Sequence, residues 1–261
     1  MEKKIISAKN NAFITDICKL KQKKHRTQTG LFYVEGKKLF NEALNSDLSI
    51  RCIIVSMENA SKVPSGKNYK ITEVTGEVYK KITDEQSPQG IMCIIEIPSK
   101  ETVLSYKKPV IILNSIRDPG NVGTIIRTAN ALCDVDIIIS EDCADIYSTK
   151  TQRAAMGSIF RQNIKISKNI EKDIANLKKN GYNILAAHLD KNSRSIDEIE
   201  FTAKTAAVFG NEGNGLCDEI VNLCDEKMII PIAQTSDSLN VSVAAGIVLW
   251  EMGKKHNGQG N

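Results

Sequence analysis

Past residue 108, short and largely apolar runs alternate with segments whose apolar residues recur at helical spacing. The runs predict six strands, at 110–113, 135–139, 164–166, 183–187, 206–209 and 228–230. The helical patterns lie near 121–132, 149–157, 170–179, 216–223 and 239–252. Apolar strands alternating with helices predict an α/β fold with a parallel sheet covered on both faces. Ligands of such sheets bind at the carboxyl ends of the strands.

The first hundred residues predict a smaller, mixed α/β unit. Phe13, Ile14, Ile17 and Leu20 share a helical face, which predicts a helix over 10–24 that runs into a positive segment. Strands are expected at 31–35, 52–56, 70–74 and 90–97, with helices at 37–45 and around Val78. Because Pro98 to Pro109 is polar, we expect one domain at 1–105 and a second at 106–261.

The net charge of +4 is unevenly distributed along the chain. Residues 1–108 carry 19 Lys and Arg against 12 Asp and Glu, whereas the remainder carries 16 against 19. A basic half suggests contact with a polyanion, although a lysine-rich solvated surface is the alternative. The residues expected to contact phosphate groups are Lys21, Lys23, Lys24 and Arg26.

Composition narrows the class of protein further. The chain has 261 residues with 41% hydrophobic and 25% charged, which is typical of a globular protein without a membrane span or signal peptide. Seven cysteines without a CxxC pair indicate free thiols in a reducing cytoplasm. No metal site is expected, because His25, His188 and His256 lie far from one another and from any cysteine pair.

Residues 227–254 read as a strand, a polar loop and a helix of small residues. Pro231 ends the strand, Ser238 is a suitable N-cap, and Gly253 is expected to stop the helix. Ala244, Ala245 and Gly246 would let another element approach the helix backbone closely. The alternative is a C-terminal helix that only packs.

Two further motifs follow predicted strands. In Asn114 to Leu132, a turn at Asp118 to Gly120 precedes a helix from which Arg127 could bind phosphate with its two-pronged guanidinium, or form an ordinary surface salt bridge. In Val208 to Leu216 the glycines are ordered GxxGxG rather than the dinucleotide-binding GxGxxG. That loop could let backbone contact a flat ligand, and Glu212 within it is either functional or a cap.

Together these motifs resemble the SpoU/TrmH family. The matching residues are Asn121, Gly123 and Arg127, then Gly210, Glu212 and Gly215, then I-P-I and S-L-N-V-S between Ile230 and Ser242. The N-terminal part is similar to the substrate-binding domain of the ribosomal-RNA members, so the resemblance spans nearly the whole chain. Gln234 departs from it, since many members have glycine there.

The resemblance implies an RNA methyltransferase that transfers a methyl group from S-adenosylmethionine to a ribose 2′-hydroxyl. The expected fold is a trefoil-knotted sheet, the expected assembly a homodimer through the C-terminal domain, and the expected substrate large-subunit ribosomal RNA. The cofactor would be held by backbone at Gly210, Ile230 and Leu239. The residues implied for catalysis are Arg127, Asn121, Glu212, Ser238 and Asn240.

The role of Arg127 has two interpretations. The family points to it as the catalytic residue, sometimes as the base, but a guanidinium stays protonated in proteins. Stabilising negative charge on the ribose oxygen is physically easier. Alternatives for the whole chain are a tRNA methyltransferase and a non-catalytic RNA-binding protein of the same fold. A dinucleotide-dependent enzyme is disfavoured by the glycine order.

Overall fold

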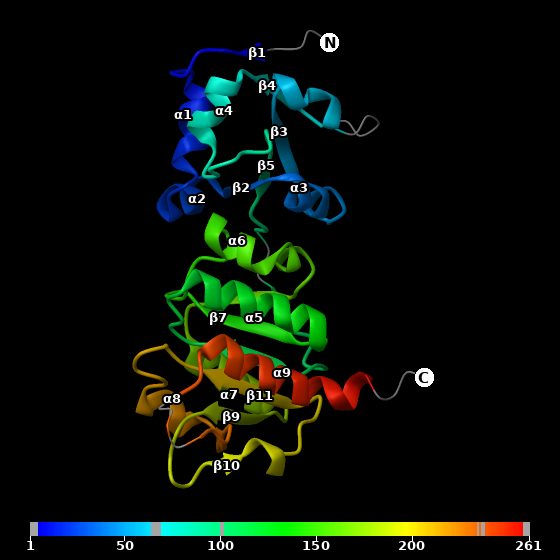
Figure 1. Cartoon of the computed structure of the whole chain (residues 1–261). Helices are drawn as coiled ribbons and strands as arrows, with labels where there is room; N and C mark the ends of the chain where they lie inside the picture. Colours follow the sequence, from blue (N-terminus) through cyan, green and yellow to red (C-terminus); the bar gives the residue numbers. More distant parts are fainter. Residues whose placement is uncertain (1–4, 64–68, 100–101, 234, 236–237, 258–261) are drawn as a thin grey trace. The chain divides into compact units, whose positions relative to one another are not determined.

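The computed structural model describes residues 5–63, 69–99, 102–233, 235 and 238–257. Contacts divide the chain into two compact units (Figure 1). The first comprises Met1–Lys100 with Tyr147–Phe160, and the second Glu101–Ile146 with Arg161–Asn261. The second unit is thus interrupted by a short segment that packs with the first. The predicted division between 105 and 106 stays a prediction about the independent folding of two domains.

The first unit is built on a five-stranded mixed sheet. Its strand order is β1 (Ile5–Ile6), β4 (Ile71–Val74), β3 (Ile50–Ser56), β5 (Ile91–Glu96) and β2 (Leu31–Glu35). The strands β1, β4 and β3 are parallel, whereas β5 is antiparallel to both its neighbours. The helical segments of this unit are α1 (Ala12–Lys19), α2 (Lys23–Thr29), α3 (Lys37–Leu44), η1 (Met57–Lys62), α4 (Gly76–Ile82), α6 (Thr149–Ala155) and η2 (Ser158–Phe160).

Side-chain alternation divides the interior of this unit between the two faces of the sheet. In β2, Tyr33 packs into the core beneath α1 and α4, whereas Phe32 and Val34 pack into the core beneath α3. Figure 1 shows α1 beside α4 and α3 across the sheet from them. The segment containing α6 packs against the core beneath α3, where the ring of Tyr147 lies 4.7 Å from that of Phe32. Gln152 fixes α6 by donating to the Tyr33 carbonyl at 3.0 Å.

The helix predicted over 10–24 is in fact two helices. Asn11 caps α1 by accepting from the Phe13 N–H at 2.9 Å, and the chain turns at Leu20 before α2 begins. Arg26 of α2 donates to the carbonyls of Leu20 and Lys21 at 2.7 and 3.0 Å, thereby satisfying groups that the end of α1 leaves unpaired. The positive run therefore straddles a helix–turn–helix corner instead of extending one helix end.

The second unit carries a seven-stranded sheet in which each pair of neighbours is parallel. Its order is β10 (Arg194–Ser195), β12 (Glu226–Ile229), β9 (Asn183–Ala187), β11 (Thr205–Phe209), β6 (Val110–Leu113), β7 (Asp136–Ser140) and β8 (Ile164–Ser167). The predicted parallel sheet and its six strands are confirmed. The sequence pattern did not predict β10, because two residues are too few to show the alternation of a strand. The helical segments are α5 (Pro119–Leu132), α7 (Ile170–Lys179), η3 (Ile196–Glu198), α8 (Asp218–Leu223) and α9 (Val241–Asn257).

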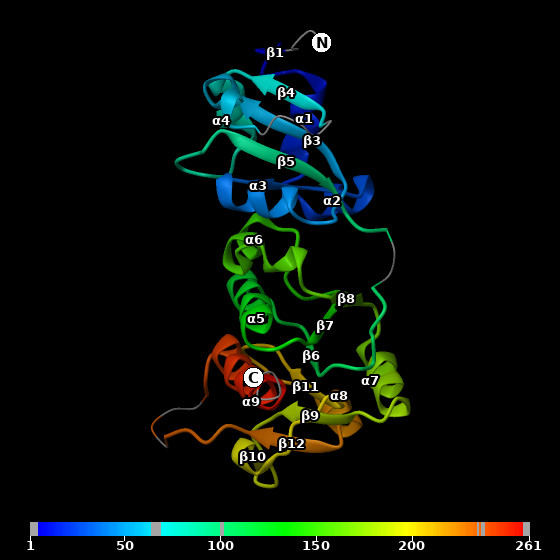
Figure 2. The ribbon, with the colours of Figure 1, turned by 90° about the vertical axis from the view of Figure 1, so that its right-hand side faces the viewer.

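Helices cover both faces of this sheet, as the continuous apolar strands predict. Val110 and Ile112 of β6 join a buried cluster with residues of α7 and α8. The intervening residue Ile111 faces the other side, where α5 and α9 lie (Figure 2). This two-sided burial explains why the strands carry few polar positions.

The prediction for the ends of the last helix was wrong at both ends. Asn240, two residues after Ser238, provides the cap, because its side chain accepts from the Ser242 N–H at 2.8 Å. The helix also continues past Gly253 to Asn257. Gly253 has a packing function: a Cβ there would lie 2.4 Å from the carbonyl oxygen of Leu132 on α5. The knotted threading implied by the family resemblance stays a prediction.

The described residues lack two features that would mark other classes of protein. None of their helices has the length and apolar character needed to span a membrane. Within the same residues, no cluster of three or more His, Cys, Asp or Glu side chains could hold a metal ion. All seven cysteines are free thiols.

Candidate active site at the carboxyl edge of the parallel sheet

Three loops that are distant in sequence meet where strands β6, β11 and β12 end. The loop after β6 is tied to the end of β11, since the Asn114 N–H donates to the Phe209 carbonyl at 2.8 Å. The amide of Asn211 reaches back from the glycine loop to the Ser115 carbonyl at 2.9 Å. Parallel strands bring their carboxyl ends to the same edge of a sheet, so the polar motifs that follow them converge.

Glu212 is the centre of this convergence. Its carboxylate accepts from the backbone N–H groups of Arg117 and Asp118 at 3.3 and 3.2 Å, and from Asn121 Nδ2 at 3.1 Å. Burial acts to raise the pKa of Glu212, but the hydrogen bonds from Asn121 and from backbone N–H groups outweigh it, so the pKa is lowered. Glu212 is therefore an ionised acceptor that fixes the loop after β6, and it is poorly suited to act as a general base.

Asn121 joins Glu212 to the beginning of the last helix. Its Oδ1 accepts from Asn240 Nδ2 at 3.1 Å, while its own Nδ2 donates to Glu212. Asn240 in turn accepts from the backbone N–H and the hydroxyl of Ser242. We call these three residues the Glu212–Asn121–Asn240 network. The structure thus brings together one predicted site residue from each of the three motifs.

Arg127 lies outside this network. It projects from α5, is exposed, and makes no hydrogen bond or ion pair within the part of the chain that the structure describes. The ordinary surface salt bridge weighed from the sequence is therefore not formed there. A guanidinium of this kind is available to an anionic ligand.

The glycine loop is compact for internal reasons. A Cβ at Gly210 would lie 2.3 Å from the backbone of Gly215, because the loop folds back through the hydrogen bonds between Asn211 and Gly215. Gly215 itself has a φ of +68°. Glycine is thus required at position 210 because the backbone of the same loop passes too close for a side chain. Its proposed backbone contact with a cofactor stays a prediction.

A cavity of about 150 Å³ lies beside the network, where β9 and β12 end. Predicted residues Ile230, Leu239 and Ser238 line it, and Leu189 and His188 enter from the loop after β9. The remaining wall is largely apolar and includes Ala244 and Val248 of α9. Leu189 was missed from the sequence, although its place after a strand that neighbours β12 could have indicated it. Gln234, whose departure from the family pattern was noted above, lies outside the described residues.

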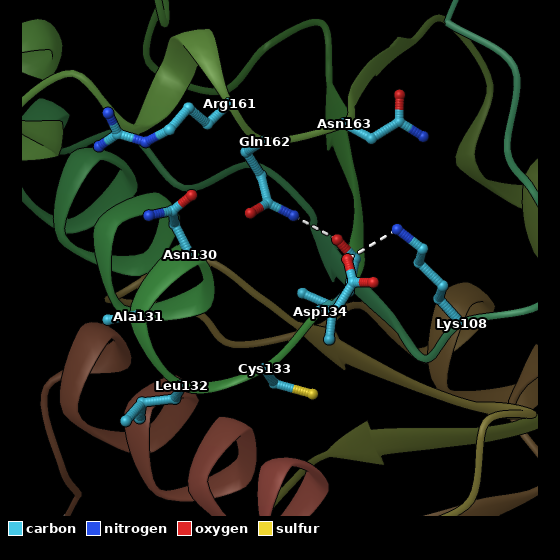
Figure 3. A pocket seen from close by; sticks show the side chains of 10 residues that line it. Lys108, Asn130, Ala131, Leu132, Cys133, Asp134, Arg161, Gln162 and Asn163 are labelled. Atoms are coloured by element: carbon cyan, nitrogen blue, oxygen red, sulfur yellow. Dashed lines mark hydrogen bonds and ion pairs between the residues drawn. The ribbon is translucent and has the colours of Figure 1, made fainter. Parts of the chain in front are cut away.

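A second, more polar cavity of about 280 Å³ lies at the opposite edge of the same sheet (Figure 3). It sits where β6, β7 and β8 begin, with Lys108 paired to Asp134 at 2.7 Å and Gln162 donating to the Val135 carbonyl. Asn163 donates to Asp136 at 2.9 Å. These polar side chains are paired with one another or with backbone, and none of them is a predicted site residue. The candidate active site therefore lies at the other edge, beside the smaller cavity.

The basic run of the first unit is not uniform. Arg26 is 5% exposed and bonds backbone carbonyls, so the structure does not favour it as an RNA contact. Lys21 donates to the Thr83 carbonyl and pairs with Asp84, both at 2.9 Å. Lys23 and Lys24 are exposed at the start of α2. Lys24 makes no hydrogen bond or ion pair within the described residues, so it is well placed to contact an external phosphate.

Two protein-family models together match most of the chain. A family model described as the SpoU rRNA methylase family matches residues 108–250, and one described as an MRM3-like substrate binding domain matches residues 11–93. The 23S rRNA (guanosine(2553)-2′-O)-methyltransferase of Bacillus subtilis is 31% identical over 96% of this chain and 99% of its own length.

The chain is also similar to a solved rRNA methyltransferase and to a tRNA methyltransferase. The structure of an rRNA methyltransferase from Sinorhizobium meliloti with bound AdoMet matches with a TM-score of 0.84, at 32% identity, over 97% of this chain and 98% of that one. The tRNA (guanosine(18)-2′-O)-methyltransferase of Escherichia coli is 31% identical over 60% of this chain and 69% of its own length.

Proposed function

The chain belongs to the SpoU rRNA methylase family and is an S-adenosylmethionine-dependent RNA ribose methyltransferase, and we propose that its substrate is large-subunit (23S) ribosomal RNA. The observation that carries the proposal is the span of the similarity. The 23S rRNA methyltransferase of Bacillus subtilis matches 96% of the chain, whereas the tRNA methyltransferase of Escherichia coli matches 60% of it. A ribosomal RNA substrate also agrees with the reducing cytoplasm expected from the free cysteines.

The apolar cavity fits part of the cofactor. When bound, S-adenosylmethionine supplies an electrophilic methyl group on sulfur. Leu189, Ile230 and Leu239 provide apolar walls suited to its adenine or thioether portion. Pockets for drug-sized ligands measure roughly 300–1,000 Å³, so a cavity of about 150 Å³ would hold one end of the molecule. Backbone at Gly210 would lie along the remainder, as the family resemblance implies.

The proposed chemistry is attack by a ribose 2′-oxygen on the methyl group, in line with the departing sulfur. The O–C bond forms as the C–S bond breaks, and the hydroxyl proton passes to solvent water. This requires the ribose to be held in position and its developing negative charge to be stabilised. We assign charge stabilisation to Arg127, because its guanidinium is exposed and unpaired among the described residues. The always-protonated guanidinium is unsuited to remove a proton.

The Glu212–Asn121–Asn240 network has a positioning role in this proposal. It ties the helix that carries Arg127 to the glycine loop and to the start of α9. Ser238 is exposed on the cavity rim, where its hydroxyl could contact ribose or cofactor. These assignments account for the polar residues without invoking a metal or a histidine-based triad.

We also propose a homodimer through α9, on a surface other than that of the small residues Ala244 to Gly246. Ala245 is buried, and the Cβ direction of Gly246 points toward Thr128 of α5, so these small residues pack within the chain. Val243 and Trp250, seven residues apart on α9, are 50% and 54% exposed. An exposed apolar stripe of this kind is typical of a subunit interface.

Methyl transfer to defined RNAs tests the function. The purified protein is incubated with isotopically labelled S-adenosylmethionine and either in vitro transcribed 23S RNA or a tRNA pool, and ribose methylation is mapped by mass spectrometry. We expect one ribose of 23S RNA to be labelled and the tRNA pool to remain unlabelled. Labelling of tRNA alone would contradict the proposed substrate, and RNA binding without transfer to any RNA would favour the non-catalytic alternative.

Light scattering of wild type and Trp250→Glu tests the assembly. The monomer mass is 28.8 kDa, so we expect wild type at twice this value and the variant near it at micromolar concentration. A monomeric wild type with full activity would refute the dimer.

A further inference from the structure

The loop after β6 contains a strained residue next to the active-site network. Ser115 has a φ of +60°, a left-handed conformation that strains a residue with a side chain. Three side chains hold it there: Ser140 Oγ accepts from its N–H at 2.9 Å, Asp142 accepts from its hydroxyl at 2.7 Å, and Asn211 donates to its carbonyl at 2.9 Å. Strain retained by so many partners suggests a functional purpose.

The consequence of this turn is the position of Arg117. Two residues after Ser115, the Arg117 N–H points at Glu212, so the α-carbon of Arg117 lies on the rim of the network. Its side chain is 68% exposed and donates from Nη2 to Asp142 at 3.2 Å. A guanidinium carries five N–H donors. Most of these donors therefore remain open to solvent at the edge of the candidate site.

Asp142 is built to hold that guanidinium in place. Its carboxylate accepts from Ser140 at 2.6 Å and from Ser115 in addition to Arg117. Burial acts to raise the pKa of Asp142, but the two hydroxyls and the charge of Arg117 outweigh it and lower the pKa. Asp142 is thus ionised at neutral pH and orients Arg117.

A purely structural role explains this pair poorly. An exposed ion pair contributes little to stability, and the hydroxyls of Ser115 and Ser140 already connect the loops after β6 and β7. The same rim carries the carboxylates of Asp118, Asp142 and Glu212, which repel an RNA backbone. A phosphate can approach this rim favourably where a guanidinium offsets their charge.

We infer that Arg117 binds a phosphate of the RNA strand next to the target ribose, with Asp142 as its positioning residue. This inference rests on the proposed RNA methyltransferase function and adds a substrate contact to it. Arg127 would then act at the reacting oxygen, while Arg117 fixes the neighbouring backbone. Two parallel hydrogen bonds from one guanidinium suit a phosphate, and an ammonium cannot reproduce them.

Filter binding and single-turnover methylation of in vitro transcribed 23S RNA test the inference. For Arg117→Ala we expect the half-saturating RNA concentration to rise at least tenfold and the log–log salt slope to fall by about 0.7–0.9. Arg117→Lys should keep the slope but bind severalfold more weakly. Asp142→Asn should weaken binding by a smaller factor at unchanged slope, because the charge of Arg117 remains.

A matched control is Arg194→Ala. Arg194 lies on the edge strand β10 and pairs with Glu226 at 2.5 Å, so this variant removes an equal charge from an ion pair outside the motifs. Its half-saturation and salt slope should match wild type. The affinity for S-adenosylhomocysteine, measured by calorimetry, should be unchanged in all these variants.

Two results would overturn the inference. If Arg117→Ala has the same half-saturating RNA concentration and the same salt slope as wild type, Arg117 does not contact a phosphate, even if the wild-type protein methylates RNA as proposed. A joint loss of melting temperature and cofactor affinity at unchanged slope would make Arg117 structural. If wild type transfers no methyl group, the proposed function fails, but filter binding still decides whether Arg117 contacts the RNA.

Discussion

Replacing Arg127 by Ala should separate stability from chemistry. The side chain is exposed and has no hydrogen bond or ion pair within the described residues, so its removal breaks no contact there. Surface substitutions of this kind change the free energy of unfolding by no more than about 0.5 kcal/mol. For a chain of this size that is a melting shift of about 1–2 °C. The apolar cavity is lined from other loops, so cofactor affinity should also be retained.

The expected loss is in the rate of transfer. Removing one preorganised group that stabilises developing charge typically lowers the rate about 10²–10³-fold, which corresponds to about 2.7–4 kcal/mol. Arg127→Lys should recover only a small part of the rate. The ammonium restores the charge but lacks the planar pair of donors.

Single-turnover methylation of 23S RNA, run beside a thermal melt and cofactor calorimetry, measures all three quantities. Asn130→Ala is a suitable control, since Asn130 is exposed on the same helix and is not among the residues implied for catalysis or cofactor binding. Near-normal transfer by Arg127→Ala would remove Arg127 from the catalytic residues. Parallel losses of melting temperature and cofactor affinity would show instead that Arg127 supports the fold.

Three further predictions concern RNA binding, helix packing and acid stability. Lys24→Ala should reduce the log–log salt slope of RNA binding by about 0.7–0.9 in filter binding, since Lys24 is exposed and has no partner among the described residues. Gly253→Ala should lower stability by about 1–3 kcal/mol in urea melts, because its Cβ would meet Leu132 at 2.4 Å, whereas Gly246→Ala should be neutral or stabilising. Burial acts to raise the pKa of Glu212, but its hydrogen bonds outweigh burial and lower the pKa. The ionised carboxylate therefore stabilises the folded protein above pH 4.5, and this contribution is lost as the pH falls through the folded-state pKa. The stability gap between wild type and Glu212→Gln should therefore stay constant from pH 7 to about pH 5 and narrow as the pH falls from about 5 to 3.

These predictions have their own controls and contrary outcomes. Lys9→Ala removes an exposed lysine that pairs with Glu77 at 3.0 Å, and it should leave the salt slope unchanged. An equal effect of Lys9→Ala and Lys24→Ala would mean that net charge, and not a contact at α2, sets the slope. Equal stability of the two glycine variants would contradict the close approach of α9 to α5. A pH-independent gap for Glu212→Gln would mean that the carboxylate stabilises nothing.

The sequence determined the class of fold and the order of its elements. Apolar strands such as Val110–Leu113 and Asn183–Ala187 lie where the pattern predicts them, because a strand buried on both faces must be apolar throughout. The sequence also determined which edge of the sheet is functional. Residues that follow parallel strands converge whatever the details of their loops, so Asn121, Glu212 and Asn240 could be grouped before their contacts were known.

Tertiary structure decided the roles of individual polar and small residues. Arg26 is a helix cap and Lys24 is not, although the two differ little in sequence context. Gly253 sits inside a helix because a backbone carbonyl from α5 occupies the space of its side chain. Arg117 and Asp142 come together from loops that follow different strands. Local sequence carries propensity and periodicity, whereas burial, pairing and close approach depend on which distant segment occupies the adjacent space; that is set only when the sheet is assembled.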